Sequence, residues 1–235
     1  MKSELRYLRN SLKRYLSMTS GGTPKHVLSM VSSMRSGNLK EALEHFWILR
    51  TEGVRKAKHM DGFTKVIEAS VRQHFPEMIF KRNHELPGYY RYSKKWDLAL
   101  YDGDTFLAAI EYKSQIGSSR KNFNNRIEEA IGNAHDLRKS CKKKKLGDPW
   151  LGYLFLMEEC EETTRSVEGR SSVYNNYKES LEALSEDLYD STCLLLTNEK
   201  TCDMVKGQEE FDHFIEDLIH HLKSSERKRK RKKKS

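Results

Sequence analysis

Apolar residues recur at helical spacing through the first part of the chain and are interrupted by two short polar segments. These segments, at residues 20–24 and 36–38, contain the Gly, Pro, Ser and Asn residues that favour turns between helices. The pattern predicts helices near residues 4–18, 24–34 and 38–50. The apolar spacing also predicts a fourth, buried helix from about 62 to 75. It is expected to end there because Pro76 disfavours helical backbone in the residue before it.

The spacing changes to that of strands after residue 88. Lys95–Tyr101 and Thr105–Ser114 are both rich in residues that favour strands. Asp102-Gly103 lies between these two segments and is a strong signal for a hairpin turn. We therefore expect the two segments to pair as antiparallel strands.

The remainder of the chain alternates between helical and strand patterns. Helices are predicted near residues 124–140, 174–189 and 208–222, and buried strands near 150–158 and 193–197. This alternation indicates an α/β fold with a mixed central β-sheet flanked by helices. The expected regions are an N-terminal helical region packed on the core (1–58), the α/β core (59–222) and a basic tail (223–235).

The composition is that of a soluble globular protein. Of the 235 residues, 33% are charged and 37% are hydrophobic, and no apolar run approaches the roughly 20 residues of a membrane-spanning helix. The first residues lack the continuous apolar segment of a signal peptide. The four cysteines form no C-x-x-C pair, so we expect an intracellular, reduced protein with four buried free thiols.

The net charge of +9 is concentrated at the C-terminal end. Residues 227–234 are eight consecutive Lys or Arg residues, and together with Glu226 they account for +7, which leaves about +2 for residues 1–225. Such a run is typical of a disordered, solvated tail. It has two open interpretations, added affinity for phosphates of nucleic acids or a solubility tail.

Candidate chemistry lies on the predicted hairpin. Glu111 and Lys113 are two residues apart on one strand and therefore share a face, and the tight turn brings Asp97 of the partner strand towards them. Two close carboxylates repel each other unless a cation lies between them, and Mg²⁺ prefers one or two carboxylates plus waters and phosphate oxygens. A nearby ammonium group can orient the attacking water and offset the charge of the phosphate. The trio therefore indicates a metal-dependent phosphodiester hydrolase.

The alternative is an ordinary cross-strand salt bridge, worth roughly 0.2–1 kcal/mol. Only two lysines follow an acidic residue by two positions, Lys113 after Glu111 and Lys228 after Glu226. The second pair lies in the charged tail, whereas the first lies at the end of an apolar strand.

The segment Lys94–Leu137 resembles the XhoI-type restriction endonucleases, which belong to the PD-(D/E)xK nuclease superfamily. The shared motifs are W-D, A-A-I-E-x-K-S-Q-x-G and N-F-N-N-R-x-E-E-A, with looser similarity in HMDGF at 59–63 and LYD at 188–190. Trp96 stands where the superfamily name has Pro, a residue that does no chemistry. The resemblance implies a PD-(D/E)xK restriction-endonuclease-like core.

The resemblance also implies an activity. Asp97 and Glu111 would be the metal ligands and Lys113 the residue that orients the water. The cofactor would be Mg²⁺, and the substrate double-stranded DNA cut at a palindrome, CTCGAG or a close relative, to leave 5′-phosphate and 3′-hydroxyl ends. A palindrome implies a homodimer with one subunit for each strand. The setting would be the cytoplasm of a prokaryotic cell that also holds a cognate DNA methyltransferase.

Further residues are candidates for accessory or DNA-binding roles. The possible accessory residues near the metal or Lys113 are Glu68, Gln115, Glu128 and Glu129, although Glu68 also fits a helix surface and the last two also fit a helix dipole. The candidate DNA-binding residues are Arg120, Lys121, Asn122, Asn124, Asn125 and Arg126. The alternative for this segment is a solvated loop with an Asn helix cap.

Three other features of the sequence bear on binding. Residues 164–176 form a second polar candidate segment for DNA contact, whereas Lys142–Lys145 is expected to be a solvated face. The nine histidines show no zinc-binding spacing.

Two alternatives to a restriction enzyme remain open from the sequence. One is another PD-(D/E)xK nuclease, such as a repair nuclease or junction resolvase. The other is a non-catalytic basic DNA-binding protein in which the strand pair is only structural.

Overall fold

The computed structural model describes residues 38–51, 57–166 and 171–232, which belong to two compact units, Met1–Ala69 and Ser70–Ser235. The predicted helices at 4–18 and 24–34 lie outside the described residues. The division between the units falls later than the predicted boundary after residue 58.

The first unit contains the predicted third helix and most of the fourth. These are α3 (Leu39–Thr51) and α4 (Asp61–Arg72), with the short 3₁₀ helix η1 (Ala57–Met60) before α4. The two helices pack closely at Gly62, where a Cβ atom would lie 2.7 Å from the Cα atom of Ala42. Both predictions are confirmed, although α4 ends at Arg72, before the predicted end near 75.

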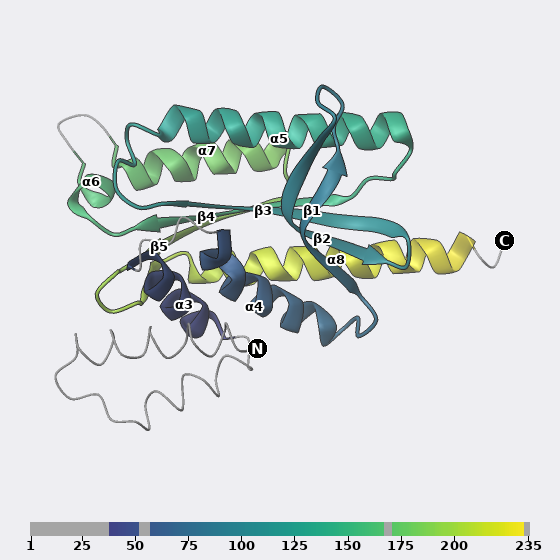
Figure 1. The fold of residues 1–235 in the computed structure, drawn as a ribbon, viewed down its shortest axis with the longest axis horizontal. Coiled ribbons are helices and arrows are strands. Elements are labelled where there is room, and N and C mark those ends of the chain that lie inside the picture. Colours follow the sequence, from purple (N-terminus) through teal and green to yellow (C-terminus); the bar gives the residue numbers. More distant parts are fainter. Residues whose placement is uncertain (1–37, 52–56, 167–170, 233–235) are drawn as a thin grey trace. The chain divides into compact units, whose positions relative to one another are not determined.

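The second unit is built on one six-stranded sheet whose strands follow the order of the sequence (Figure 1). The strands are β1 (Ile79–Pro87), β2 (Ser93–Asp102), β3 (Thr105–Gln115), β4 (Trp150–Glu158), β5 (Ser191–Thr197) and β6 (Met204–Lys206). The pairs β3–β4 and β4–β5 are parallel and the other pairs are antiparallel. The predicted mixed sheet is therefore confirmed.

The predicted hairpin of β2 and β3 is also confirmed. Asp102 pairs with Thr105, and Gly103 occupies the turn between them with a φ of 57°, a backbone conformation that glycine adopts without strain. The register pairs Leu98 with Ile110 in the centre of the two strands. The turn thereby sets which residues of the two strands lie side by side.

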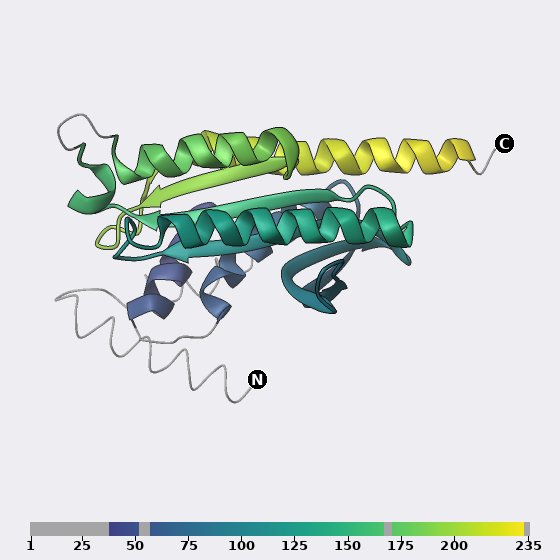
Figure 2. The ribbon, with the colours of Figure 1, turned by 90° about the horizontal axis from the view of Figure 1, so that it is seen from above.

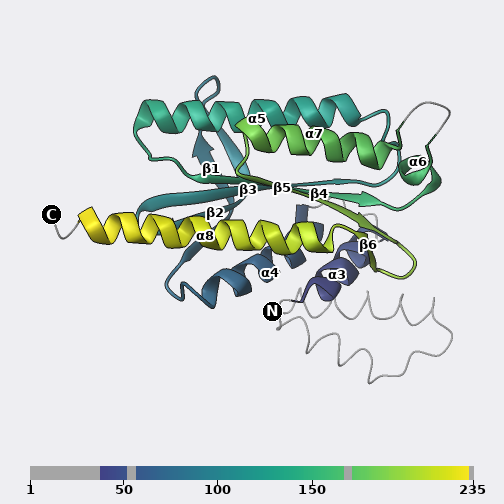
Figure 3. The ribbon, with the colours of Figure 1, turned by 180° about the vertical axis from the view of Figure 1, so that it is seen from behind.

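Helices cover both faces of this sheet. Figures 1 and 2 show α5 (Phe123–Lys144) and α7 (Val173–Asp187) on one face, and Figure 3 shows α8 (Gln208–Lys232) on the other. On the α5 side, Ala109 and Tyr153 of the sheet share a buried cluster with Ala130 of α5 and Tyr177 of α7. The short helix α6 (Glu161–Thr164) follows β4.

The basic tail differs from the prediction. The last helix, predicted to end near residue 222, continues as α8 to Lys232. Arg229 of α8 forms an ion pair of 2.7 Å with Asp102, beside the β2–β3 turn. The prediction of a disordered tail is therefore wrong up to Lys232, and residues 233–235 lie outside the described part of the chain.

The cysteines partly follow the prediction. All four are free thiols; Cys141 and Cys193 are buried, as expected, whereas Cys160 and Cys202 are partly exposed. Cys160 precedes the short helix α6 and Cys202 lies in a turn, where little covers them. Within the described residues, no helix has the length and apolar character needed to cross a membrane.

Candidate active site

Asp97, Glu111 and Lys113 come together on the sheet. Because Leu98 pairs with Ile110, the next residues along β2 and β3, Asp97 and Glu111, lie beside each other. Glu111 and Lys113 share the face of Ala109, which is the face covered by α5. The backbone N–H of Tyr112 donates a hydrogen bond of 2.7 Å to Oδ2 of Asp97, which holds this carboxylate against β3.

Glu111 is the centre of the cluster and is only 3% exposed. Its Oε1 lies 3.0 Å from Nζ of Lys113, and its Oε2 lies 2.5 Å from Nζ of Lys94. Each carboxylate oxygen therefore has its own ammonium partner. Lys94 is a site residue that the sequence motif does not reveal, because only the strand register brings it to Glu111.

The electrostatics of the cluster are those of two buried carboxylates close together. Burial and the charge of Glu111 raise the pKa of Asp97 to about 6 from its ordinary 3.8, against the opposing effects of the Tyr112 N–H, Lys94 and Lys113. Burial lowers the pKa of Lys113, but the charge and hydrogen bond of Glu111 outweigh it and raise this pKa. Lys113 is therefore charged at neutral pH, whereas the charged form of the Asp97 carboxylate is destabilised.

This donor set fits a hard divalent cation. The side-chain atoms that could bind a metal here are the carboxylate oxygens of Asp97 and Glu111. Within the described residues, no group of three or more His, Cys, Asp or Glu side chains could enclose a metal ion. Mg²⁺ needs no such cage, since it is commonly held by one or two carboxylates with waters and phosphate oxygens. A cation between Asp97 and Glu111 would also relieve the repulsion that raises the pKa of Asp97.

A second group of polar residues borders Lys113 on the α5 side. Glu129 of α5 lies 3.7 Å from Nζ of Lys113 and 2.9 Å from Nη1 of Arg126. The Arg126 Nε donates to Oε1 of Gln115 at 3.4 Å, and the Gln115 amide donates to the Gly117 carbonyl at 2.6 Å. Two predicted accessory residues, Gln115 and Glu129, thus lie next to the cluster.

The other two accessory candidates lie elsewhere. Glu128 is exposed on α5, and none of the contacts described above involves it. Glu68 lies on α4, in the first unit, so its role stays a prediction.

The loop before α5 and the first turn of this helix carry the predicted DNA-binding residues, and hydrogen bonds from its backbone hold the loop in place. The Gly117 N–H donates to Glu158 of β4 at 3.1 Å, and the Arg120 N–H donates to Glu162 of α6 at the same distance. The exposed side chains of the predicted DNA-binding group are those of Arg120, Lys121, Asn124 and Asn125. The remaining two differ: Asn122 precedes α5 without a side-chain cap bond, and Arg126 turns towards Gln115.

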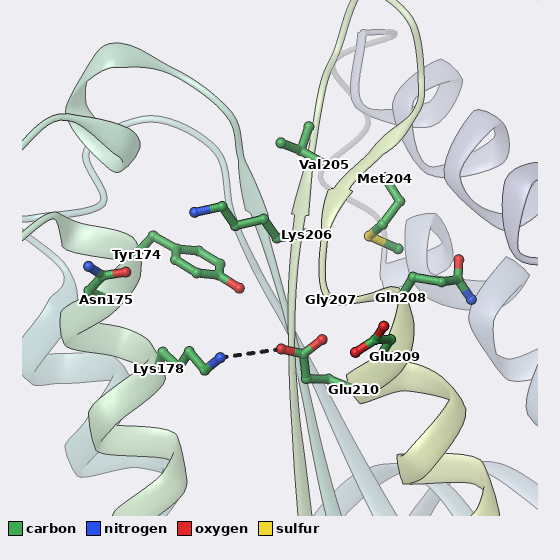
Figure 4. Close-up of a pocket in the computed structure, with 10 residues that line it drawn as sticks. All are labelled: Tyr174, Asn175, Lys178, Met204, Val205, Lys206, Gly207, Gln208, Glu209 and Glu210. Atoms are coloured by element: carbon green, nitrogen blue, oxygen red, sulfur yellow. Dashed lines mark hydrogen bonds and ion pairs between the residues drawn. The ribbon is translucent and has the colours of Figure 1, made fainter.

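A shallow pocket of about 620 Å³ lies away from this cluster, between α7 and the segment that joins β6 to α8 (Figure 4). Its lining residues are Tyr174, Asn175, Lys178, Met204, Val205, Lys206, Gly207, Gln208, Glu209 and Glu210. Lys178 and Glu210 pair across it at 3.5 Å, and Lys206 lies over the ring of Tyr174. Since β6 is at the opposite edge of the sheet from β1 and β2, this pocket is not part of the carboxylate cluster.

Comparison with known proteins identifies the family of the chain. The family model described as "Restriction endonuclease XhoI" matches residues 49–206, which include the whole carboxylate cluster. The chain belongs to the XhoI restriction endonuclease family.

Three curated relatives are type II restriction enzymes. XhoI of Xanthomonas vasicola is 46% identical over 128 residues, which is 51% of this chain and 52% of XhoI. BstVI of Geobacillus stearothermophilus is 33% identical over 174 residues, or 63% of this chain and 77% of BstVI. AbrI of Azospirillum brasilense is 41% identical over 118 residues, or 47% and 53%. The matches thus span about half the length of two of these relatives, and no solved structure matches the chain with significance.

Proposed function

We propose that this member of the XhoI family is a Mg²⁺-dependent type II restriction endonuclease with a PD-(D/E)xK core. The observation that carries the proposal is the cluster of Asp97, Glu111 and Lys113 on adjacent strands, in a chain of this family. The two carboxylates come from different strands and would bind the metal, and the Lys113 ammonium, 3.0 Å from Oε1 of Glu111, would be the cationic group beside it.

In the proposed reaction, Asp97 and Glu111 would hold the Mg²⁺ ion, and the Tyr112 N–H keeps the Asp97 carboxylate in place. When bound, the metal supplies polarisation of the scissile phosphate and a lower pKa for a bound water. Lys113 remains protonated, so its ammonium group orients the attacking water and offsets the phosphate charge. Lys94 holds Oε2 of Glu111 in the metal-free protein, so it would compete with a metal bound by this carboxylate.

The proposed products are DNA ends with a 5′-phosphate and a 3′-hydroxyl group. The proposed target is the palindrome CTCGAG, which calls for two subunits related by a two-fold axis, one for each strand. A cognate DNA methyltransferase would protect the same sites in the cytoplasm of the prokaryotic host. These expectations rest on the family to which the chain belongs.

Plasmid cleavage tests the proposal. We expect discrete fragments in Mg²⁺, none in EDTA, and end sequencing that maps every cut to one palindrome. A smear, or cleavage only of branched DNA, would indicate another nuclease with this core. Binding of the plasmid without any cleavage would indicate a non-catalytic DNA-binding protein.

A further inference from the structure

The loop between β1 and β2 exposes three tyrosines. Tyr89, Tyr90 and Tyr92 are 43%, 65% and 101% exposed, and they make up three of the seven large exposed apolar side chains in the described part of the chain. The loop rises beside α5 (Figures 1 and 3). Clustered exposed aromatic side chains are a mark of binding surfaces rather than of an ordinary solvated loop.

The loop is held in one conformation by buried polar residues of α5. The Asp136 carboxylate, only 5% exposed, accepts hydrogen bonds from the N–H groups of Tyr89 and Tyr90 at 2.9 and 2.7 Å. Arg91 donates to Asp136 through Nε and to buried Asn133 through Nη2, both at 2.9 Å. A loop fixed in this way loses little conformational entropy when it binds a partner.

Gly88 shows how tightly the loop is folded. A Cβ atom at this position would lie 2.3 Å from the carbonyl oxygen of Arg91 and 2.8 Å from Oδ2 of Asp136. Only glycine therefore allows the backbone to close over the carboxylate that organises the loop.

Lysines of α5 flank the tyrosine rings. Lys139 donates to the Tyr90 hydroxyl at 2.8 Å, and its Nζ lies 5.4 Å from the ring centre of Tyr89. The Nζ of Lys143 lies 5.2 Å from the ring centre of Tyr89. Residues 139–145, KSCKKKK, contain five lysines and no acidic residue, so this surface favours an anionic partner. Tyr89, Tyr90, Tyr92, Lys139 and Lys143 are called the Tyr–Lys surface below.

We propose that the Tyr–Lys surface binds the duplex beside the scissile bond, with Lys139 and Lys143 on phosphates and the tyrosines at the sugar and groove edge. This rests on the proposed endonuclease function. Asp97 follows Tyr92 by five residues, about 17 Å of extended chain at roughly 3.3 Å per residue. That span is roughly five base-pair steps of 3.4 Å, so a duplex held at the carboxylate cluster reaches both places.

The charge of the surface favours DNA over a second copy of this chain. Duplex DNA offers an unbroken row of phosphates, whereas a second copy of this chain carries a net charge of +9. Aromatic side chains beside phosphate-binding lysines also suit the sugar and base edges of a groove.

Salt-dependent binding of the full chain in EDTA tests the proposal. The probe is a duplex of about 20 base pairs carrying CTCGAG, and the variant is K139Q/K143Q. We expect the slope of log K against log salt to fall by about 2, because two phosphate contacts are lost. The matched control is Lys200→Gln, an exposed lysine after β5, which should leave the slope unchanged.

Tyr92→Ala tests the aromatic part and cannot disturb the core, because this side chain is fully exposed. We expect it to weaken binding of the duplex about tenfold. Val205→Ala, at a 39% exposed apolar residue of β6, should have no effect.

The outcomes separate this proposal from the endonuclease proposal. Salt slopes and affinities equal to those of the two controls would overturn the Tyr–Lys surface, even if the chain cuts plasmid DNA normally. A change in sedimentation mass without a change in DNA affinity would make the surface a subunit interface and would also overturn it. Loss of affinity in a chain that cuts no DNA would support the surface and reject the endonuclease.

Discussion

At the scale of single residues, the site depends on the contacts of Glu111. Lys94 and Lys113 each occupy one of its carboxylate oxygens, at 2.5 and 3.0 Å. We infer that a metal bound by Glu111 would compete with Lys94 for Oε2, so Lys94 should lower the metal affinity of the DNA-free protein. Lys113 contacts the other oxygen, Oε1, and its pKa is raised. Its ammonium group therefore stays charged and suits the proposed role of orienting the water.

Replacing Lys94 by Met should therefore raise the affinity of the DNA-free chain for Mn²⁺ roughly tenfold, because a positive charge next to the metal is removed. Mn²⁺ binding can be measured by electron paramagnetic resonance, without DNA or catalysis. Lys95→Met is the matched control, since Lys95 is the neighbouring exposed lysine. Equal affinities of the two variants would show that Lys94 does not compete with the metal.

Asp97 should destabilise the metal-free protein at neutral pH. Its pKa is raised from 3.8 to about 6 in the fold, so the cost of the buried carboxylate is absent below about pH 4 and complete above about pH 6. Asp97→Asn keeps an oxygen for the Tyr112 N–H and removes the charge. At pH 8 in EDTA the variant should be more stable by up to about 3 kcal/mol, a gain that disappears near pH 4.

Urea unfolding at the two pH values measures this difference in the free energy of unfolding. Asp104→Asn, in the exposed hairpin turn, is the control and should change stability little at either pH. A stability gain for Asp97→Asn that is the same at both pH values would contradict the assignment of the raised pKa to this carboxylate.

At the scale of elements, the strands that are buried could be predicted from the sequence, whereas the exposed edge strands could not. The buried strands β4 and β5 and the hairpin of β2 and β3 were predictable, since their apolar runs and the turn at Gly103 are local signals. The edge strands β1 and β6 were missed, because their residues are mostly polar or exposed and pair only through their neighbours.

The extension of α8 was also missed, for a different reason. A run of eight basic residues repels itself and indicates disorder when only local sequence is considered. In the structure, the apolar residues Phe211, Phe214 and Leu218 anchor the helix, and Arg229 pairs with Asp102 at its far end. These contacts are made with distant parts of the chain, which sequence spacing does not reveal.

Alanine substitutions at two glycines, one in β4 and one in α5, test how these elements pack. At Gly152 of β4, an added Cβ atom would lie 2.5 Å from the Phe214 ring of α8, so Gly152→Ala should destabilise the fold by about 1–3 kcal/mol. At Gly132 of α5 an added Cβ atom meets nothing within 4 Å, so Gly132→Ala should stabilise the fold by roughly 0.5–1 kcal/mol. Urea unfolding measures both, and equal effects would contradict the packing of α8 on β4.

At the scale of the whole molecule, the carboxylate cluster links the fold to the proposed activity. The sequence motif identified Asp97, Glu111 and Lys113, and the register of β2 and β3 brings them together. Lys94 and the inward turn of Arg126 depend on three-dimensional contacts and could not be predicted from spacing. The subunit arrangement on a palindrome is likewise a property of surfaces that a sequence motif does not define.

The most direct test of the central claim compares Glu111→Gln with Glu128→Gln in cleavage of a duplex that carries CTCGAG. Glu111 is buried in the cluster and Glu128 is exposed on α5, so the same chemical change is made inside and outside the site. We predict that Glu111→Gln lowers the Mg²⁺-dependent cleavage rate by at least about 10³-fold while the duplex is still bound, and that Glu128→Gln cuts normally. Cleavage by Glu111→Gln at the rate of the unmodified chain would contradict the account.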